Sequence, residues 1–339
     1  MTEILQTPKL VTVFGGSGFL GRHVVRALAR RGYRIRVATR RPELAGHLQP
    51  LGNVGQIQAV QANLRVRWSV DRAVHGADHV INLVGILFES GSQSFSSIQD
   101  EGARAVAEAA REAGAGLTHV SAIGADPDGD SVYARTKALG EKAITETVAD
   151  AVIFRPSIVF GPEDGFFNRF ANMARFAPAL PLIGGGTTRL QPVFVGDVAE
   201  AVARSVDGQV KGGRIYELGG PNVMTFRQAM HQMLEVIDRK RLLVTVPWWL
   251  AYLKARFLGL LPNPLLTTDQ VTLLKTPNVV SAAAEADGRT LAGIGISPQS
   301  VATILPSYLW RYRVAGQFTD LREQWLAQLT PEERQKLEE

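Results

Sequence analysis

The chain has 339 residues, of which 45% are hydrophobic and 20% are charged, and its formal net charge is +5. This length predicts about two domains, or one large domain with an appended lobe. The complete lack of cysteine excludes thiol nucleophiles, disulfides, and zinc or iron–sulfur sites with cysteine ligands. No run of about 18 uncharged apolar residues and no secretory signal are present, so we expect a cytoplasmic chain without a transmembrane span.

Much of the positive charge is local, because six arginines lie between residues 30 and 41. Such a cluster is typical of a solvated face, and it also fits nucleic acid, acidic lipid or a cofactor phosphate. No basic stripe interleaved with aromatic residues is present, so we expect no nucleic-acid partner. The six histidines show no metal-ligand spacing, and we expect no metal site.

A glycine-rich turn near the N-terminus follows a predicted buried strand over Leu10–Phe14 and precedes a predicted helix over Phe19–Arg31. Its glycines, Gly15, Gly18 and Gly21, form the pattern G-x-x-G-x-x-G. In a nucleotide site they allow the tight turn, the approach of a pyrophosphate and the close packing of helix on strand. The free amides and the positive end of the helix dipole then face the phosphates. The alternative is a structural turn, but its place between strand and helix favours the nucleotide site.

The following segments alternate between strand and helix patterns. Strands are predicted over 34–39, 56–60, 77–84, 117–121 and 151–155, with helices over 66–75, 94–113 and 131–148. This alternation predicts a doubly wound, Rossmann-type α/β fold with a parallel sheet and helices on both faces.

The residue type at the end of the second predicted strand distinguishes a site for NAD(H) from a site for NADP(H). An acidic residue there would bind the ribose 2′-hydroxyl of NAD. The chain instead has Thr39-Arg40-Arg41, and arginine favours a 2′-phosphate through charge-assisted hydrogen bonds. The alternative is a basic surface pair. Together with the glycine turn, Arg40 predicts NADP(H).

Tyr133 and Lys137 lie four residues apart in a predicted helix, so both side chains lie on one helical face. A lysine ammonium near a phenol favours the phenolate and can hold a ribose hydroxyl. That arrangement suits proton transfer to or from a carbonyl or alcohol beside a nicotinamide.

These motifs together resemble the extended or atypical branch of the short-chain dehydrogenase/reductase superfamily. Asn82 with Gly85, and the segment 155–162, also match it. The resemblance implies that residues 15–20 hold the pyrophosphate, Arg40 the 2′-phosphate and Lys137 the nicotinamide ribose. It implies the following cofactor-binding residues: Gly15, Ser17, Gly18, Phe19, Leu20, Gly21, Arg40, Asn63 and Leu64 beside the adenine, Val84 and Gly85 beside the nicotinamide, Tyr133, Lys137 and Pro156.

One position departs from the superfamily pattern. A serine or threonine near the end of the fifth strand binds the substrate carbonyl in the superfamily. Ser121 is one or two positions early for that role, and Ala122 or Ile123 occupies the place. Loss of such a group lowers a rate by about 10²–10⁴. Tyr133 and Lys137 are therefore expected to be residual or vestigial catalytic residues.

Three longer blocks, at residues 131–142, 160–170 and 190–199, resemble the NAD(P)H-binding accessory subunits of respiratory complex I. The likeness runs from about residue 8 to about 310. It implies tightly bound, structural NADPH and other complex I subunits as partners. It also implies peripheral contact with the membrane surface, at the cytoplasmic face of the respiratory membrane where the two arms meet. The alternatives are a free NADP(H)-dependent reductase, dehydrogenase or epimerase using Tyr133 and Lys137, and an NADP(H)-binding redox sensor.

The domain expectation is a dinucleotide-binding domain over 8–165, completed by segments of about 190–220. A smaller α/β lobe over 166–311 and a charged helical tail over 312–339 follow. In the small lobe we expect a turn at 178–181, Asp197 and Thr225 as helix N-caps, and a helix over 246–261. Apolar side chains lie on all sides of that last helix. It can therefore belong to the core, to an interface with a partner protein or to an interface with lipid.

Overall fold

A seven-stranded parallel sheet organises the computed structural model, which describes residues 8–261, 264, 266–314, 318, 325–326 and 328–330. The strand order is β11-β6-β5-β4-β1-β2-β3, and every neighbouring pair is parallel. The strands are β1 (Leu10–Phe14), β2 (Arg34–Thr39), β3 (Ile57–Gln61), β4 (His79–Asn82), β5 (Gly116–Val120), β6 (Val152–Pro156) and β11 (Arg214–Leu218).

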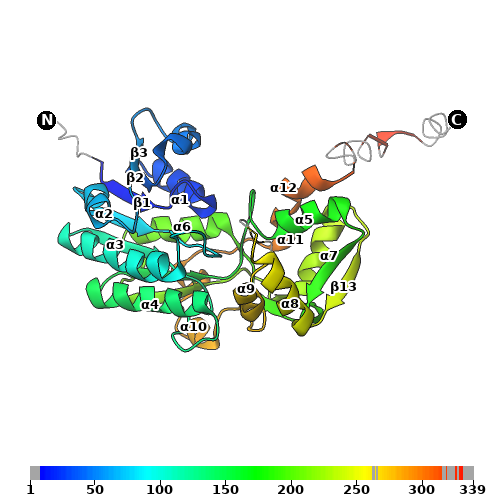
Figure 1. Cartoon of the computed structure of the whole chain (residues 1–339). Helices are drawn as coiled ribbons and strands as arrows, with labels where there is room; N and C mark the ends of the chain where they lie inside the picture. The colour runs from blue at the N-terminus through cyan, green and yellow to red at the C-terminus, as the bar shows by residue number, and fades with distance from the viewer. Residues whose placement is uncertain are drawn as a thin grey trace.

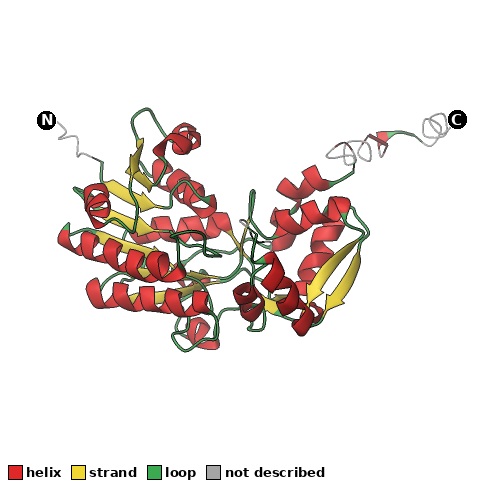
Figure 2. Ribbon diagram, in the orientation of Figure 1, coloured by secondary structure: helices red, strands yellow, loops and turns green. Residues whose placement is uncertain are grey.

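Helices cover both faces of this sheet (Figure 2). On one face α1 (Phe19–Arg30) packs beside α6 (Val195–Val206), and on the other α3 (Glu101–Glu112) packs between α2 (Arg67–Val74) and α4 (Val132–Thr147). Each face has its own buried apolar cluster. Both faces of a parallel sheet must be covered in this way, because its strands are apolar on both sides. The predicted doubly wound Rossmann-type fold is confirmed.

The remaining elements build a second lobe, on the right in Figure 1. Its strands are β7 (Val159–Phe160), β8 (Ala179–Ile183), β9 (Arg189–Leu190), β10 (Val193–Phe194), β12 (Met224–Thr225) and β13 (Leu242–Val246). Its longer helices are α5 (Phe167–Phe176), α7 (Phe226–Val236) and α8 (Trp248–Leu258). Short helices follow at α9 (Thr268–Leu273), α11 (Val301–Ile304) and α12 (Pro306–Leu309). A further short helix, α10 (Ala282–Ala286), begins after Ser281, whose amide donates to Glu217 of β11 at 2.7 Å.

Aromatic side chains form the core of the second lobe. Phe160, Phe167 and Phe226 belong to one buried cluster that α5, α7, β8 and α11 enclose. The rings of Phe160 and Phe167 meet edge to face with centroids 5.9 Å apart, which is a favoured aromatic geometry. Among the described residues, no helix is both long enough and apolar enough to cross a bilayer.

Four expectations for individual elements need correction. The turn expected at 178–181 is strand β8, and Pro181 is tolerated there because β8 pairs along one side only, with β13. Asp197 is not an N-cap, since α6 begins at Val195 and the Asp197 carboxylate accepts from the Gln299 amide at 2.7 Å. The helix expected over 94–113 contains a π-turn at Ser96–Asp100. The helix expected over 246–261 covers only Trp248–Leu258.

Thr225 is the N-cap of α7, as predicted, with a complete capping box to Gln228. The charged helical tail expected over 312–339 lies mostly outside the described residues.

Candidate functional site

The glycine turn stands at the carboxyl end of β1, where the strand order reverses between β1 and β4. In open α/β sheets this edge is the ligand-binding edge. Gly15 has a φ of +77°, and a Cβ there would meet the backbone of Leu83 at 3.2 Å. A Cβ on Gly21 would lie 2.2 Å from the Gly15 carbonyl oxygen. Both positions therefore require glycine, and the turn packs directly against the end of β4.

The first turn of α1 begins at this glycine turn. Gly18 is its N-cap, no side chain caps it, and its first turn contains no acidic residue. A Cβ on Gly18 would touch only the Gly15 carbonyl, at 3.3 Å. The amides of Phe19 and Leu20 follow at the helix start, where amide groups have no intrahelical acceptor. This helix end can accept an anion through its amides and its dipole.

Two predicted residues lie where the turn meets β2. Ser17 Oγ is 3.5 Å from Thr39 Oγ1, which links the turn to the last residue of β2. Arg40 follows directly and is exposed, and its Nη1 donates to Gln93 Oε1 at 2.5 Å. Arg40 therefore presents its charge at this edge on the side of β2, as an adenosine 2′-phosphate would require.

The residues predicted beside the adenine follow β3. Asn63 is half-buried, and its backbone amide and carbonyl both bond Ser69 Oγ. Leu64 is 8% exposed and packs in the cluster beneath α3, where a Cβ on Gly102 would meet it at 3.1 Å. Asn63 is thus the more accessible of the two.

On the other side of β1, the end of β4 meets α4. Asn82 is buried, and its Oδ1 accepts from the Val84 amide at 3.1 Å. Gly85 faces Lys137, since a Cβ at Gly85 would lie 3.2 Å from Lys137 Nζ. The structure therefore brings Val84, Gly85 and Lys137 together, although they are far apart in the sequence.

Tyr133 and Lys137 are neighbours on α4, and the ammonium lies 6.0 Å from the centre of the phenol ring. Lys137 is 4% exposed and donates to the Val120 carbonyl at 3.3 Å. Burial lowers the Lys137 pKa to about 8. Burial, reinforced by Asp269, raises the pKa of Tyr133 to about 12. The raised pKa makes the phenolate that general-base catalysis needs less accessible than in a free tyrosine.

The end of β5 approaches the same pair. Ser121 is 5% exposed, and its Oγ has no hydrogen-bond partner among the described residues. His119 is also buried, and burial together with nearby Lys137 lowers its pKa well below the usual value. Ile123, two residues beyond Ser121, packs in an apolar cluster with Val280 and Ala284. The superfamily's hydroxyl position thus carries either a buried serine or an apolar side chain.

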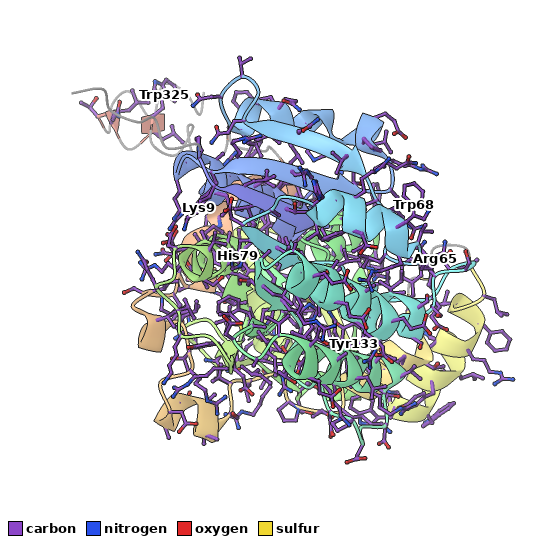
Figure 3. The ribbon with its side chains drawn as sticks, turned by 90° about the vertical axis from the view of Figure 1, so that its left-hand side faces the viewer. Lys9, Arg65, Trp68, His79, Tyr133 and Trp325 are labelled. Atoms are coloured by element: carbon purple, nitrogen blue, oxygen red, sulfur yellow. The ribbon has the colours of Figure 1, made fainter. Side chains whose placement is uncertain are left out.

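Pro156 ends β6 beside this region. It is buried, and its carbonyl accepts from the Ile123 amide at 3.0 Å. The preceding Arg155 makes a two-pronged ion pair with buried Glu141 of α4, at 2.9 and 2.6 Å. That pair fixes α4, and with it Tyr133 and Lys137, against the sheet. Tyr133 is labelled in Figure 3.

Two residues that the sequence analysis missed join the second lobe to the site. Asp269 of α9 accepts from Ser131 Oγ and from the Val132 amide, both at 2.8 Å, at the start of α4. Asn278 bonds Ser157 Oγ at 2.6 Å and the Ile123 carbonyl at 3.2 Å. A capping pattern at 267–270 predicts a helix start, but no sequence signal pairs Asp269 with a helix so distant in the chain.

The assembled site has a glycine turn at the start of α1, a cation after β2 and a buried lysine beside Gly85. These residues fit a dinucleotide with a 2′-phosphate. Within the described part of the chain, no group of three or more histidine and acidic side chains could hold a metal ion.

Comparisons with known proteins agree with this geometry. The family described as NAD dependent epimerase/dehydratase matches residues 11–219. The chain is 32% identical over 320 residues to "NADH dehydrogenase [ubiquinone] 1 alpha subcomplex subunit 9, mitochondrial" of Arabidopsis thaliana, covering 91% of this chain and 79% of that one. It is 35% identical over 190 residues to a ceramide reductase of Caulobacter vibrioides, covering 56% of this chain and 58% of the other. The fold is similar to that of a dTDP-glucose 4,6-dehydratase from Streptomyces venezuelae, with a TM-score of 0.68, 20% identity and coverage of 91% and 98%.

Proposed function

We propose that this chain, which belongs to the NAD dependent epimerase/dehydratase family, is an NADP(H)-binding, non-catalytic accessory subunit of respiratory complex I. In this role it stabilises the complex or helps to assemble it, at the junction of the peripheral and membrane arms. The resemblance to the short-chain reductases and to the complex I subunits is confirmed by the comparisons. The observation that carries the proposal is the 32% identity to a complex I subunit over most of both chains.

The site supports binding more than catalysis. The glycine turn, the uncapped start of α1 and Lys137 together fit a bound dinucleotide. Burial raises the Tyr133 pKa to about 12, and Ile123 packs against apolar side chains. When bound, a nicotinamide would supply hydride chemistry, whereas these residues supply binding and orientation. We infer that NADPH is held tightly as part of the structure.

Arg40 supports the choice of NADP(H) over NAD(H). It directly follows β2 and donates to a neutral amide oxygen, so its charge can bind a phosphate dianion there. Arginine and phosphate form charge-assisted, often two-pronged hydrogen bonds. No acidic residue stands beside Arg40 in the Thr39-Arg40-Arg41 segment to bind a 2′-hydroxyl instead.

An apolar surface on α8 supports the peripheral membrane contact. Trp249, Leu253 and Phe257 recur every fourth residue and are 68%, 47% and 65% exposed. Exposed apolar patches mark interaction surfaces, and aromatic rings suit a membrane interface. The segment between Asp238 and Asp269 contains no acidic residue. It contains five basic residues: Arg239, Lys240, Arg241, Lys254 and Arg256. This charge fits the anionic cytoplasmic face of a respiratory membrane.

Native electrophoresis of detergent-solubilised membranes tests the proposal. We expect the chain to migrate with NADH dehydrogenase activity. Gly18→Asp places a carboxylate where the pyrophosphate is expected, and it should reduce both nucleotide content and assembly of the complex. Tyr133→Phe removes only a hydroxyl and should leave assembly intact. Equal effects of the two substitutions, or a chain that never migrates with the complex, would contradict the proposal.

The second candidate function is a free NADP(H)-dependent short-chain reductase, dehydrogenase or epimerase that uses Tyr133 and Lys137. The 35% identity to a ceramide reductase favours it over the matched region. Steady oxidation of NADPH by the purified protein with a carbonyl substrate, abolished by Tyr133→Phe, would establish this alternative.

A further inference from the structure

The loop after β4 crosses the carboxyl edge of the sheet. β4 lies on one side of β1, whereas β2 and β3 lie on the other, so a segment that runs from β4 to the ends of β2 and β3 passes over the end of β1. The tip of this loop, residues 90–93, is a hairpin in which Ser90 and Gln93 exchange backbone hydrogen bonds of 3.1 and 3.0 Å. The hairpin therefore lies across the side of the candidate site where adenosine is expected.

Two guanidinium groups hold the tip of this hairpin. Arg40, after β2, donates to Gln93 Oε1 at 2.5 Å. Arg65, two residues beyond Asn63, donates from Nη1 to the Ser92 carbonyl at 3.1 Å. Both arginines are exposed, and Arg65 is labelled in Figure 3. Two positive charges from neighbouring strand ends thus converge on adjacent residues of one hairpin, and the acceptors they have among the described residues are neutral oxygens.

We propose that Arg65 is a second arginine of the 2′-phosphate site, and that the hairpin at residues 90–93 occupies this site until a 2′-phosphorylated dinucleotide replaces its bonds to Arg40 and Arg65. This inference rests on the proposed NADP(H) site. It adds Arg65 to that site, and it adds that the nucleotide replaces the hairpin as the partner of both arginines. The ligand class is a nucleotide with a phosphomonoester on the ribose 2′-oxygen.

The exchange is favourable because the competing acceptors differ in charge. An ionised phosphate adds the attraction of opposite charges and a two-pronged geometry to the hydrogen bonds of a guanidinium, and a neutral amide or carbonyl oxygen offers neither. Two arginines at one dianion add charge and direction that a single arginine lacks. An NAD(H) ribose offers only a hydroxyl at this position, so it does not displace the hairpin.

The contacts at the base of the loop allow the tip to move alone. Gln99 donates to the Ile86 carbonyl at 2.8 Å, and Gln270 of α9 donates to the Leu87 carbonyl at 3.3 Å. These bonds fix the residues that follow Val84 and Gly85. Gly91, at the turn of the hairpin, has a φ of +56°, a conformation that glycine adopts without strain and can leave at little cost.

Isothermal titration calorimetry on the purified full-length protein tests the inference with two probes, adenosine 2′,5′-bisphosphate and 5′-AMP. They differ only by the 2′-phosphate. Arg65→Gln should weaken the bisphosphate about three- to fivefold, as expected for an exposed charge-assisted pair, and leave AMP unchanged. Gln93→Ala should bind the bisphosphate as tightly as the wild type or more tightly, because it removes a competing acceptor.

Arg72→Gln is the matched control, since Arg72 also lies near the end of β3 but stacks on Trp68 at 5.1 Å and should leave both probes unchanged. Equal weakening of both probes by Arg65→Gln, or no weakening, overturns the inference. So does weaker bisphosphate binding in Gln93→Ala. A wild type that prefers the bisphosphate while Arg65→Gln has no effect overturns only this inference, whereas a wild type without preference contradicts the proposed NADP(H) site itself.

Hydrogen–deuterium exchange of the wild type gives a second measurement. NADPH should raise exchange at residues 90–93 relative to NADH, because the hairpin loses its two arginine contacts. Identical hydrogen–deuterium exchange with NADPH and with NADH would contradict the replacement of the hairpin by the nucleotide at Arg40 and Arg65.

Discussion

Lys137 lies beneath Gly85 with its ammonium on the Val120 carbonyl, and this burial determines how the Tyr133–Lys137 pair behaves. A short-chain reductase needs a charged lysine that makes the phenolate accessible. Here the Lys137 pKa falls to about 8 and the Tyr133 pKa rises to about 12. Both shifts come mainly from the removal of water around the two groups. These shifts support the proposed role of the pair, which is to hold a ribose rather than to transfer a proton.

The buried lysine predicts a pH dependence of stability. Its pKa is about 8 in the folded chain against 10.5 in the reference state. Between pH 8 and pH 10.5 the unfolded chain binds more protons than the folded chain, so the free energy of unfolding rises with pH. Below about pH 8 the full cost of burying the charged lysine remains. A shift of this size corresponds to about 3 kcal/mol at most. Urea denaturation at several pH values from about 7 to about 9.5 should show a rising slope that Lys137→Met lacks.

Lys142→Met, on the exposed face of the same helix, serves as the control for removing a lysine from α4. If the wild type and Lys137→Met show the same pH slope, Lys137 is not buried as a titrating group.

At the scale of elements, α4 is positioned from both ends by residues of other elements. Glu141 of α4 pairs with Arg155 of β6. At the start of the helix, Asp269 of α9 accepts from the N-cap residue Ser131 and from the Val132 amide. A carboxylate at a helix N-terminus accepts from free amides and interacts favourably with the helix dipole. The orientation of Tyr133 therefore depends on the second lobe, whose α9 lies beside the start of α4.

Asp269→Asn should lower the Tyr133 pKa from about 12, because Asp269 is one of the causes that raise it. It should also lower the free energy of unfolding by about 1 kcal/mol through the weakened contact at the start of α4. Spectrophotometric titration of the phenol and urea denaturation measure the two effects. Asp287→Asn, which alters an exposed ion pair with Arg289, is the control. An unchanged phenol titration in Asp269→Asn would show that the two lobes do not contact each other in this way.

At the scale of the whole molecule, the two lobes present different surfaces. The sheet-bearing lobe carries the candidate dinucleotide site, and the second lobe carries the exposed apolar face of α8 together with a segment rich in cations. Asn278 and Asp269 bridge the lobes close to the site. A bound dinucleotide and a docked surface would therefore act on one connected structure, as expected for a subunit that stabilises an assembly.

The face of α8 predicts binding to lipid vesicles that contain anionic lipid. The double variant Trp249→Ala/Phe257→Ala should reduce binding in a flotation assay by about tenfold or more, because it removes two large exposed apolar side chains. Trp68→Ala is the matched control, since Trp68 is 64% exposed but lies on α2. Unaltered vesicle binding of the double variant, together with loss of complex I association, would assign this face to a protein partner.

The sequence by itself determined the local features of this protein. Strand patterns that alternate with helix patterns predicted the parallel sheet, because both patterns are read directly from neighbouring residues. The spacing of Gly15, Gly18 and Gly21 predicted the turn, and a separation of four residues placed Tyr133 beside Lys137, because helix geometry fixes both. Element ends were less accurate, as where Pro181 lies inside β8, since tertiary pairing overrides local turn preference.

The tertiary structure decided which distant residues complete the site. Gly85 meets Lys137, Asp269 contacts the start of α4, and Arg65 reaches the hairpin at residues 90–93. Each contact joins segments that are far apart in the chain, so no local pattern encodes it. Burial likewise set the pKa values of Tyr133 and Lys137, because the number of waters around a side chain depends on how the whole molecule packs.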